Sequence, residues 1–132
     1  MKKRDLVAIA SAVGLLLIIP LGIQPAFAAA TPSNCTQTWD TPHVGSGGLI
    51  LGSGTGNCTT TASRTFEISL VHYFGSIFPD VTVTTSANGG SKKVYPVSYS
   101  ICDNGGTSEF YNHAFFSGYS GGNSPHALFA HC

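Results

Sequence analysis

The sequence predicts an all-β fold, namely a small disulfide-bonded antiparallel β-sandwich or barrel. Three observations support this prediction. Apolar residues alternate with polar ones over several short stretches, and turn signals rich in Gly and Asn separate these stretches. No helical periodicity occurs after residue 28. Four cysteines lie in the same part of the chain, and an even number in a small exported chain is typical of a disulfide framework.

The first 28 residues have the features of an export signal of the bacterial kind. Three basic residues at positions 2–4 precede an apolar run, and Ala26-Phe27-Ala28 supplies the small-x-small pattern of a cleavage site. The apolar run of about 14 residues is shorter than the roughly 20 needed to span a bilayer as a helix. We therefore expect a cleaved signal peptide at residues 1–28 and a single secreted domain at residues 29–132. A cut after Ala30 is the alternative.

Residues 29–132 carry little charge. They contain three basic and five acidic residues, which gives a net charge of −2. So few cations release few counterions from a phosphate backbone, and nucleic-acid binding is not expected. The same shortage argues against an electrostatic hold on anionic lipid, so membrane contact is expected only during export.

The four cysteines allow three disulfide connectivities. We favour Cys35–Cys58 with Cys102–Cys132, because each pair then encloses one half of the domain. In the chain-entropy description, each such bridge stabilises the fold by roughly 3–4 kcal/mol. Metal binding is the alternative, but no C-x2-C spacing supports it. We therefore predict two disulfides and no metal or other cofactor.

The first half of the domain is predicted to begin with a loop. Residues 40–57 are rich in glycine, which disfavours regular structure, so we predict a long loop with one short strand at residues 49–51. From Thr60 the pattern changes to period two, with apolar residues at positions 66, 68 and 70, as in a half-buried strand. Pro79-Asp80 marks a turn before two further alternating valines.

The second half is predicted to consist of strands and tight turns. Asn88-Gly89-Gly90 is a hairpin signal, since these residues tolerate positive φ. Pro96 cannot donate to a ladder, which favours an edge or bulge position. The predicted strands are 94–102, 109–117 and 125–132, joined by connections at 103–106 and 118–124.

Three patterns that suggest catalysis or metal binding lack the partners they need. Residues 118–122 (Gly-Tyr-Ser-Gly-Gly) are similar to the segment around a trypsin-like nucleophile, but Tyr119 replaces the acidic residue and nothing fixes a His–Asp pair. Residues 52–56 are similar to a phosphate loop without its Lys or helix. His126 and His131 would point to opposite faces of one strand. We therefore expect no enzyme, and variants of Ser120 and His126 would probe a hydrolase.

Trp39 is the leading candidate for a binding residue. It is the only tryptophan and lies beside Asp40 in the first disulfide loop, where a large aromatic side chain can anchor a partner. The alternative is that Trp39 fills one end of the core. The other aromatic residues are mostly assigned to the core. Adjacent pairs such as Phe115-Phe116 face opposite sides of a strand, so one of each pair lies outside it, and such residues exposed together would suit a protein or sugar partner.

The C-terminal part resembles a known family. Phe116-Ser117-Gly118-Tyr119, the Gly- and Asn-rich link and residues 126–132 are similar to the end of the small secreted alpha-amylase inhibitors of actinobacteria, the tendamistat-like proteins. This resemblance implies a β-sandwich with cysteines paired first to second and third to fourth, and inhibition of an amylase. That family blocks the enzyme with Trp-Arg-Tyr in the first disulfide loop, where this chain has Trp39-Asp40-Thr41.

The sequence therefore favours a secreted, non-catalytic protein that binds another protein. The specific hypothesis is inhibition of a secreted glycoside hydrolase of the alpha-amylase type, with Trp39, Asp40 and Tyr119 as candidate contact residues. One alternative is a self-assembling or structural cell-surface protein, which low charge and exposed Ser/Thr strands favour. Another is a bacteriocin-like secreted toxin, for which size and export are suitable.

Overall fold

Strands make up most of residues 29–132, the part of the chain that the computed structural model describes. The predicted all-β fold is confirmed, and the expected signal peptide at residues 1–28 lies outside the described residues. The elements are β1 (Cys35–Trp39), β2 (His43–Val44), the 3-10 helix η1 (Ser46–Gly48), β3 (Ile50–Tyr73), β4 (Val81–Ile101), β5 (Thr107–Phe116), β6 (Gly122–Asn123) and β7 (Ala127–Ala130).

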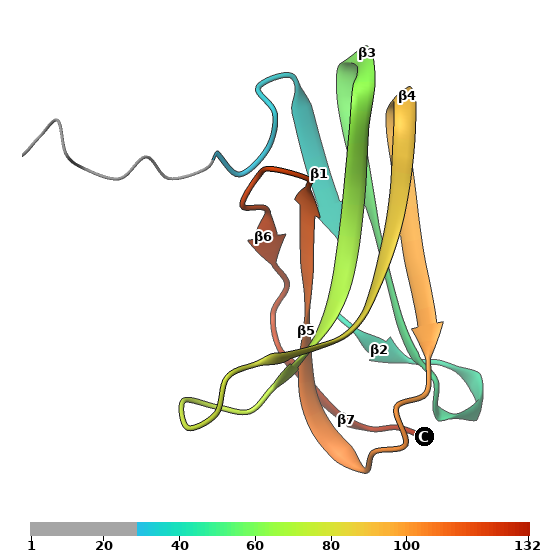
Figure 1. Ribbon diagram of the computed structural model, residues 1–132. Helices are drawn as coiled ribbons and strands as arrows, with labels where there is room; N and C mark the ends of the chain where they lie inside the picture. The colour runs from blue at the N-terminus through green and yellow to red at the C-terminus, as the bar shows by residue number, and fades with distance from the viewer. Residues whose placement is uncertain (1–28) are drawn as a thin grey trace, which may run out of the picture.

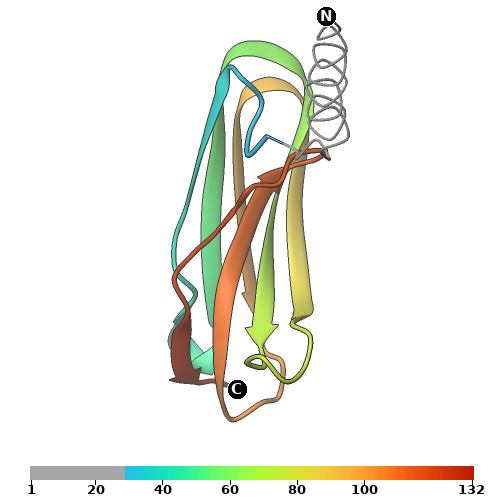
Figure 2. The same ribbon diagram turned by 90° about the vertical axis from the view of Figure 1, so that its left-hand side faces the viewer.

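Two long strands, β3 and β4, belong to both layers of a sandwich. The first half of β3 pairs with β1 and with the second half of β4, whereas its second half pairs with β5 and with the first half of β4. β2 pairs with the start of β3, and β6 and β7 pair with β5, all antiparallel. Both long strands arch from one layer to the other (Figures 1 and 2). At this crossing the register between them shifts, between Asn57 and Ala62 of β3. One curled sheet thus forms both layers.

The predicted long loop over residues 40–57 is wrong for its second part, because residues 50–57 form the start of β3. Glycine occupies every second position there, and Gly52, Gly54 and Gly56 are buried between the layers. The period of two is that of a strand face, although the residues on this face have no side chains. Alternating glycine therefore indicates a strand approached closely by other groups and not a flexible loop.

Aromatic rings fill the space that these glycines leave. A Cβ atom on Gly56 would lie 2.5 Å from Cζ of Phe116 and 3.0 Å from Cγ of Phe66. A Cβ atom on Gly52 would collide with the ring of Tyr99, its direct register partner on β4. Phe66 and Phe116 are fully buried and their ring centroids are 4.9 Å apart. The glycines of β3 thus leave room for rings from β4 and β5 and for Phe66 of the other half of β3.

Asn88-Gly89-Gly90 does not form the predicted hairpin turn but lies inside β4, opposite residues 64–66 of β3. Gly90 has φ of +122°, in the region that favours glycine, close to the level where β4 crosses between layers. The turn signals at Pro79-Asp80 and at residues 103–106 do mark connections between strands. In the described part of the chain β4 pairs only with β3, so the edge position predicted from Pro96 is confirmed.

The C-terminal region is less regular than predicted. The expected strand at residues 125–132 is shorter and covers only Ala127–Ala130, and the expected link at 118–124 contains the two residues of β6. The predicted disulfides are confirmed. Cys35–Cys58 joins direct register partners on β1 and β3, and Cys102–Cys132 ties the chain end to the end of β4.

A buried polar side chain, Asn112 of β5, connects the layers. The Tyr99 hydroxyl donates a hydrogen bond to its Oδ1 at 2.5 Å, and its Nδ2 donates to the backbone oxygen of Asp40 at 2.8 Å and to Oδ1 of Asp40 at 3.0 Å. Burial, and then the negative charge of Asp40, raise the pKa of the Tyr99 hydroxyl far above its usual range. The hydroxyl therefore keeps its proton at neutral pH and donates it to Asn112.

We predict that Gly56→Ala lowers the free energy of unfolding by about 1–3 kcal/mol, since the new methyl group overpacks against Phe116 and Phe66. The matched control is Gly106→Ala, where a Cβ atom meets nothing within 4 Å, and its effect should stay within about 0.5 kcal/mol. Urea unfolding of residues 29–132 with oxidised cysteines measures both values. Equal effects at the two positions would show that the inner face of β3 is not tightly packed.

We also predict that stability falls as the pH rises above about 10, the usual pKa of tyrosine. A pKa raised in the folded state means that the folded protein holds the proton more tightly than the unfolded chain. This contribution is complete below the unfolded pKa and is lost as the pH rises past it. Urea midpoints at about pH 8 and about pH 11 should differ less in Tyr99→Phe than in the wild type. The same alkaline fall in both proteins would contradict this role for Tyr99.

Candidate functional site

The connection between β3 and β4 exposes a cluster of apolar side chains. We name Phe74, Ile77, Phe78, Pro79 and Val81 the apolar loop. Ile77 is 82% exposed and Phe78 64% exposed, and Phe74, Phe78, Pro79 and Val81 surround an open apolar hollow of about 410 Å³. The segment projects beyond the sandwich (Figure 1). Clustered exposed apolar residues of this kind mark interaction sites.

The start of the apolar loop is held by packing and by turn chemistry. The ring centroids of Phe74 and His72 are 4.0 Å apart, and those of His72 and the buried Phe110 are 4.8 Å apart. Gly75 follows with φ of +77°, a conformation that favours glycine, and lets the chain leave β3 sharply. The exposed apolar residues therefore begin from a fixed position on the sheet.

The end of the apolar loop is held by Asp80. Oδ2 of Asp80 accepts a hydrogen bond from the Tyr111 hydroxyl at 2.9 Å, and Oδ1 accepts one from the backbone N–H of Phe74 at 3.5 Å. Burial and the hydrogen bond to Asp80 raise the pKa of Tyr111, so its hydroxyl keeps the donated proton at neutral pH. A loop held at both ends loses less conformational entropy when it binds.

The three residues predicted to make contacts lie outside the apolar loop. Trp39 ends β1 and packs against the core, with its ring beside Gly122, where a Cβ atom would lie 2.6 Å from Cη2 of Trp39. The Asp40 carboxylate accepts hydrogen bonds from the backbone N–H of Ser53 at 2.8 Å and from the Ser53 hydroxyl at 3.0 Å, in addition to the one from Asn112. Tyr119 is 36% exposed in the connection after β5. Trp39 and Asp40 thus have clear structural roles.

The residues considered for catalysis are not brought together. His126 stacks on Tyr111, with ring centroids 4.9 Å apart, and its Nδ1 lies 2.9 Å from Oε1 of Glu109. The backbone N–H of Ser120, the residue after Tyr119, donates to the carbonyl of Ala29 at 3.0 Å. Among residues 29–132, no group of three His, Cys, Asp or Glu side chains is placed to hold a metal ion.

Comparisons with known proteins do not identify a family. A scan against protein-family models, a search of curated proteins and a search of solved structures found no match. Within residues 29–132 there is also no helix of the length and apolar character needed to cross a membrane. A functional proposal therefore depends on the geometry of this chain.

Sequence reasoning missed the apolar loop because it assigned Phe74 and Phe78 to the core. A usable signal was present. Gly75, Ser76 and Pro79 interrupt any strand in this segment, so the apolar residues among them cannot alternate toward a core. Large apolar residues inside a turn segment are the pattern that indicates exposure.

We predict that Tyr111→Phe loosens the apolar loop, because Asp80 then loses its hydroxyl partner. Loss of a hydrogen bond of about 1 kcal/mol corresponds to about a fivefold rise in local opening. Chymotrypsin cleavage after Phe74 or Phe78 should accelerate by about that factor. Tyr119→Phe is the matched control and should cleave at the wild-type rate. Unchanged cleavage in Tyr111→Phe would mean that Asp80 does not hold the loop.

Proposed function

We propose that this chain is an exported, non-catalytic binding protein that inserts its apolar loop into a cleft of another secreted protein. The exposure of Ile77 and Phe78 on a loop held at both ends is the observation that supports this proposal. A secreted glycoside hydrolase of the alpha-amylase type is the first partner to test. Two disulfides and the character of the first 28 residues support export, because disulfides persist in oxidising compartments.

Charge favours a protein partner over a lipid surface. The only charged residue between Phe74 and Val81 is Asp80, and residues 29–132 carry a net charge of −2. Lys92 and Lys93 lie near the middle of β4, at its bend, where Lys92 pairs with Ala62, more than ten residues along the strand from the loop. An anionic lipid surface would therefore repel the apolar loop, whereas an apolar protein cleft would accept it.

Self-assembly through a sheet edge has weaker support. Within residues 29–132 β4 pairs only with β3, and its other edge carries Lys92, Lys93 and Pro96. Lysine and proline on an edge strand oppose pairing with a second sheet. The bacteriocin-like toxin remains a hypothesis from the sequence alone, and growth inhibition of related strains tests it.

The proposal predicts inhibition of a secreted hydrolase by residues 29–132. Alpha-amylase is titrated first, then a panel of other secreted glycoside hydrolases, with activity and direct binding as readouts. Each buried apolar side chain stabilises by roughly 1.5–3 kcal/mol, so the double variant Ile77→Ser/Phe78→Ser should weaken binding by about a hundredfold or more.

The matched control is Leu128→Ser, which removes an apolar side chain that is 69% exposed on β7. Binding of this variant should equal that of the wild type. No inhibition or binding across the panel at micromolar excess would reject hydrolases as partners. An equal loss in both variants would show that the apolar loop is not the contact surface.

A further inference from the structure

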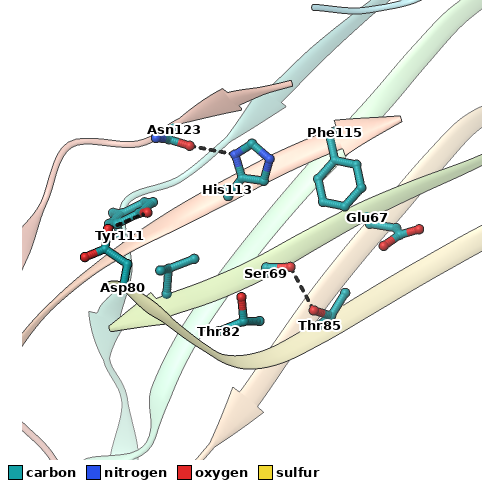
Figure 3. A pocket seen from close by; sticks show the side chains of 10 residues that line it. Glu67, Ser69, Asp80, Thr82, Thr85, Tyr111, His113, Phe115 and Asn123 are labelled. Carbon is teal, nitrogen blue, oxygen red and sulfur yellow. Dashed lines mark hydrogen bonds between the residues drawn. The ribbon is translucent and has the colours of Figure 1, made fainter. Parts of the chain in front are cut away.

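One layer contains β5, the second half of β3 and the first half of β4. The side of this layer that faces away from the core is hollowed into a groove of about 520 Å³, which we name the outer groove. Its lining comes from the faces of β3, β4 and β5 that point away from the core, with Asp80 at one end and Asn123 of β6 at the margin (Figure 3). This volume lies within the range of roughly 300–1,000 Å³ found for small-molecule sites. The outer groove is distinct from the exposed side chains of the apolar loop.

The register of β3 and β5 places a row of rings along one side of the outer groove. Successive positions on one face of a strand are about 6.6–6.8 Å apart. The cross-strand pairs along the groove are Glu67 with Phe115, Ser69 with His113 and Val71 with Tyr111. The rings of His113 and Phe115 are stacked, with centroids 5.0 Å apart, and all three β5 rings are partly exposed.

The polar side chains beside the rings are held in fixed positions. Nδ1 of His113 lies 2.6 Å from Oδ1 of Asn123. The hydroxyl of Ser117 donates to Oε1 of Glu67 at 2.9 Å, and the hydroxyls of Ser69 and Thr85 lie 2.8 Å apart. That bond engages Oε1 of Glu67, and a carboxylate can accept further hydrogen bonds, including one from a ligand at Oε2. Such oriented groups give a site specificity at low entropic cost.

The charges of the outer groove restrict the class of ligand. Two carboxylates, Glu67 and Asp80, contribute to its lining and no Lys or Arg does. Phosphate, sulfate and acidic sugars would be repelled. A neutral sugar has apolar ring faces that suit aromatic side chains and hydroxyl groups that can donate to carboxylates and exchange hydrogen bonds with Ser and Thr.

We propose that the outer groove binds a neutral oligosaccharide. The sugar contacts the exposed parts of the stacked His113 and Phe115 rings, and Tyr111, one face of which is covered by His126, lies at the end of the row. The sugar hydroxyls bond to Glu67 and to the Ser69–Thr85 pair. This site goes beyond the proposed insertion of the apolar loop into a protein, because it uses a different surface and a different class of ligand. A primary amine could use the same carboxylates, so an amine is included in the test.

Residues 29–132 with oxidised cysteines are titrated by calorimetry and by NMR with neutral hexasaccharides of glucose, mannose and N-acetylglucosamine. At least one should bind and shift the amide signals of β5. Loss of one aromatic–sugar contact should weaken binding about tenfold in Phe115→Ala. Glu67→Gln keeps the shape of the side chain and should also weaken binding several-fold. Thr36→Ala, an exposed change on β1, is the control and should bind like the wild type.

Three results would overturn this proposal. The first is that no hexasaccharide binds at millimolar concentration, and the second is that Phe115→Ala and Glu67→Gln both keep wild-type affinity. The third is that spermidine, a polyamine, binds at β5 more tightly than any of the sugars and displaces them. The two proposals fail independently. Ile77→Ser/Phe78→Ser should leave sugar affinity unchanged, and Phe115→Ala should leave hydrolase inhibition unchanged. A sugar-binding protein without a hydrolase partner would support the outer groove and reject only the role of the apolar loop.

Discussion

The close approach of aromatic rings to a strand face without side chains is the constraint on which this structure depends. At Gly52, Gly54 and Gly56 the inner face of β3 consists of backbone alone. Tyr99 occupies the space at Gly52, and the buried rings of Phe66 and Phe116 occupy it at Gly56. This approach lets the first half of β3 lie centrally between β1 and β4 while its second half crosses into the other layer (Figure 2). Larger side chains on this face would keep the layers apart.

Both candidate surfaces lie on the second half of the β3–β4 hairpin. The apolar loop closes the end of that hairpin, and the outer groove is formed by the outward faces of the same strands together with that of β5. The bond between Asp80 and Tyr111 belongs to both, because it holds the end of the loop and forms one end of the groove. The Cys102–Cys132 bridge and the buried Asn112 hold the remaining strands against this hairpin. The core therefore positions β5 beside this hairpin, and both surfaces depend on that placement.

The sequence predicts the fold class and the disulfides well, because strand alternation and cysteine spacing are local patterns. The strand through Phe66, Ile68 and Leu70 is recognisable in this way. The start of β3 is not, since propensity assigns glycine to loops, and two of the rings that fill the space, Tyr99 and Phe116, come from β4 and β5, far along the chain. Asn88-Gly89-Gly90 also misleads, because the conformational freedom of its glycines serves the bend of β4 and not a turn. The apolar loop had a local signal in Gly75 and Pro79, and alternation predicts that one of Phe115 and Phe116 lies outside the core, as Phe115 does. The grouping of Phe115 with Glu67 and Ser69 into one groove could not be predicted, because it depends on which strands become neighbours.

The central claim is that residues 50–57 form a buried central strand and not a glycine-rich loop. Native-state amide hydrogen exchange at Gly54 and Gly56, read by NMR on residues 29–132, tests it most directly. Both residues lie between β1 and β4, so their amides should be protected to an extent similar to those of Ile68 and Leu70 in the second half of the same strand. Exchange of both glycine amides at the rate of an unstructured chain, with Ile68 and Leu70 still protected, would contradict the account.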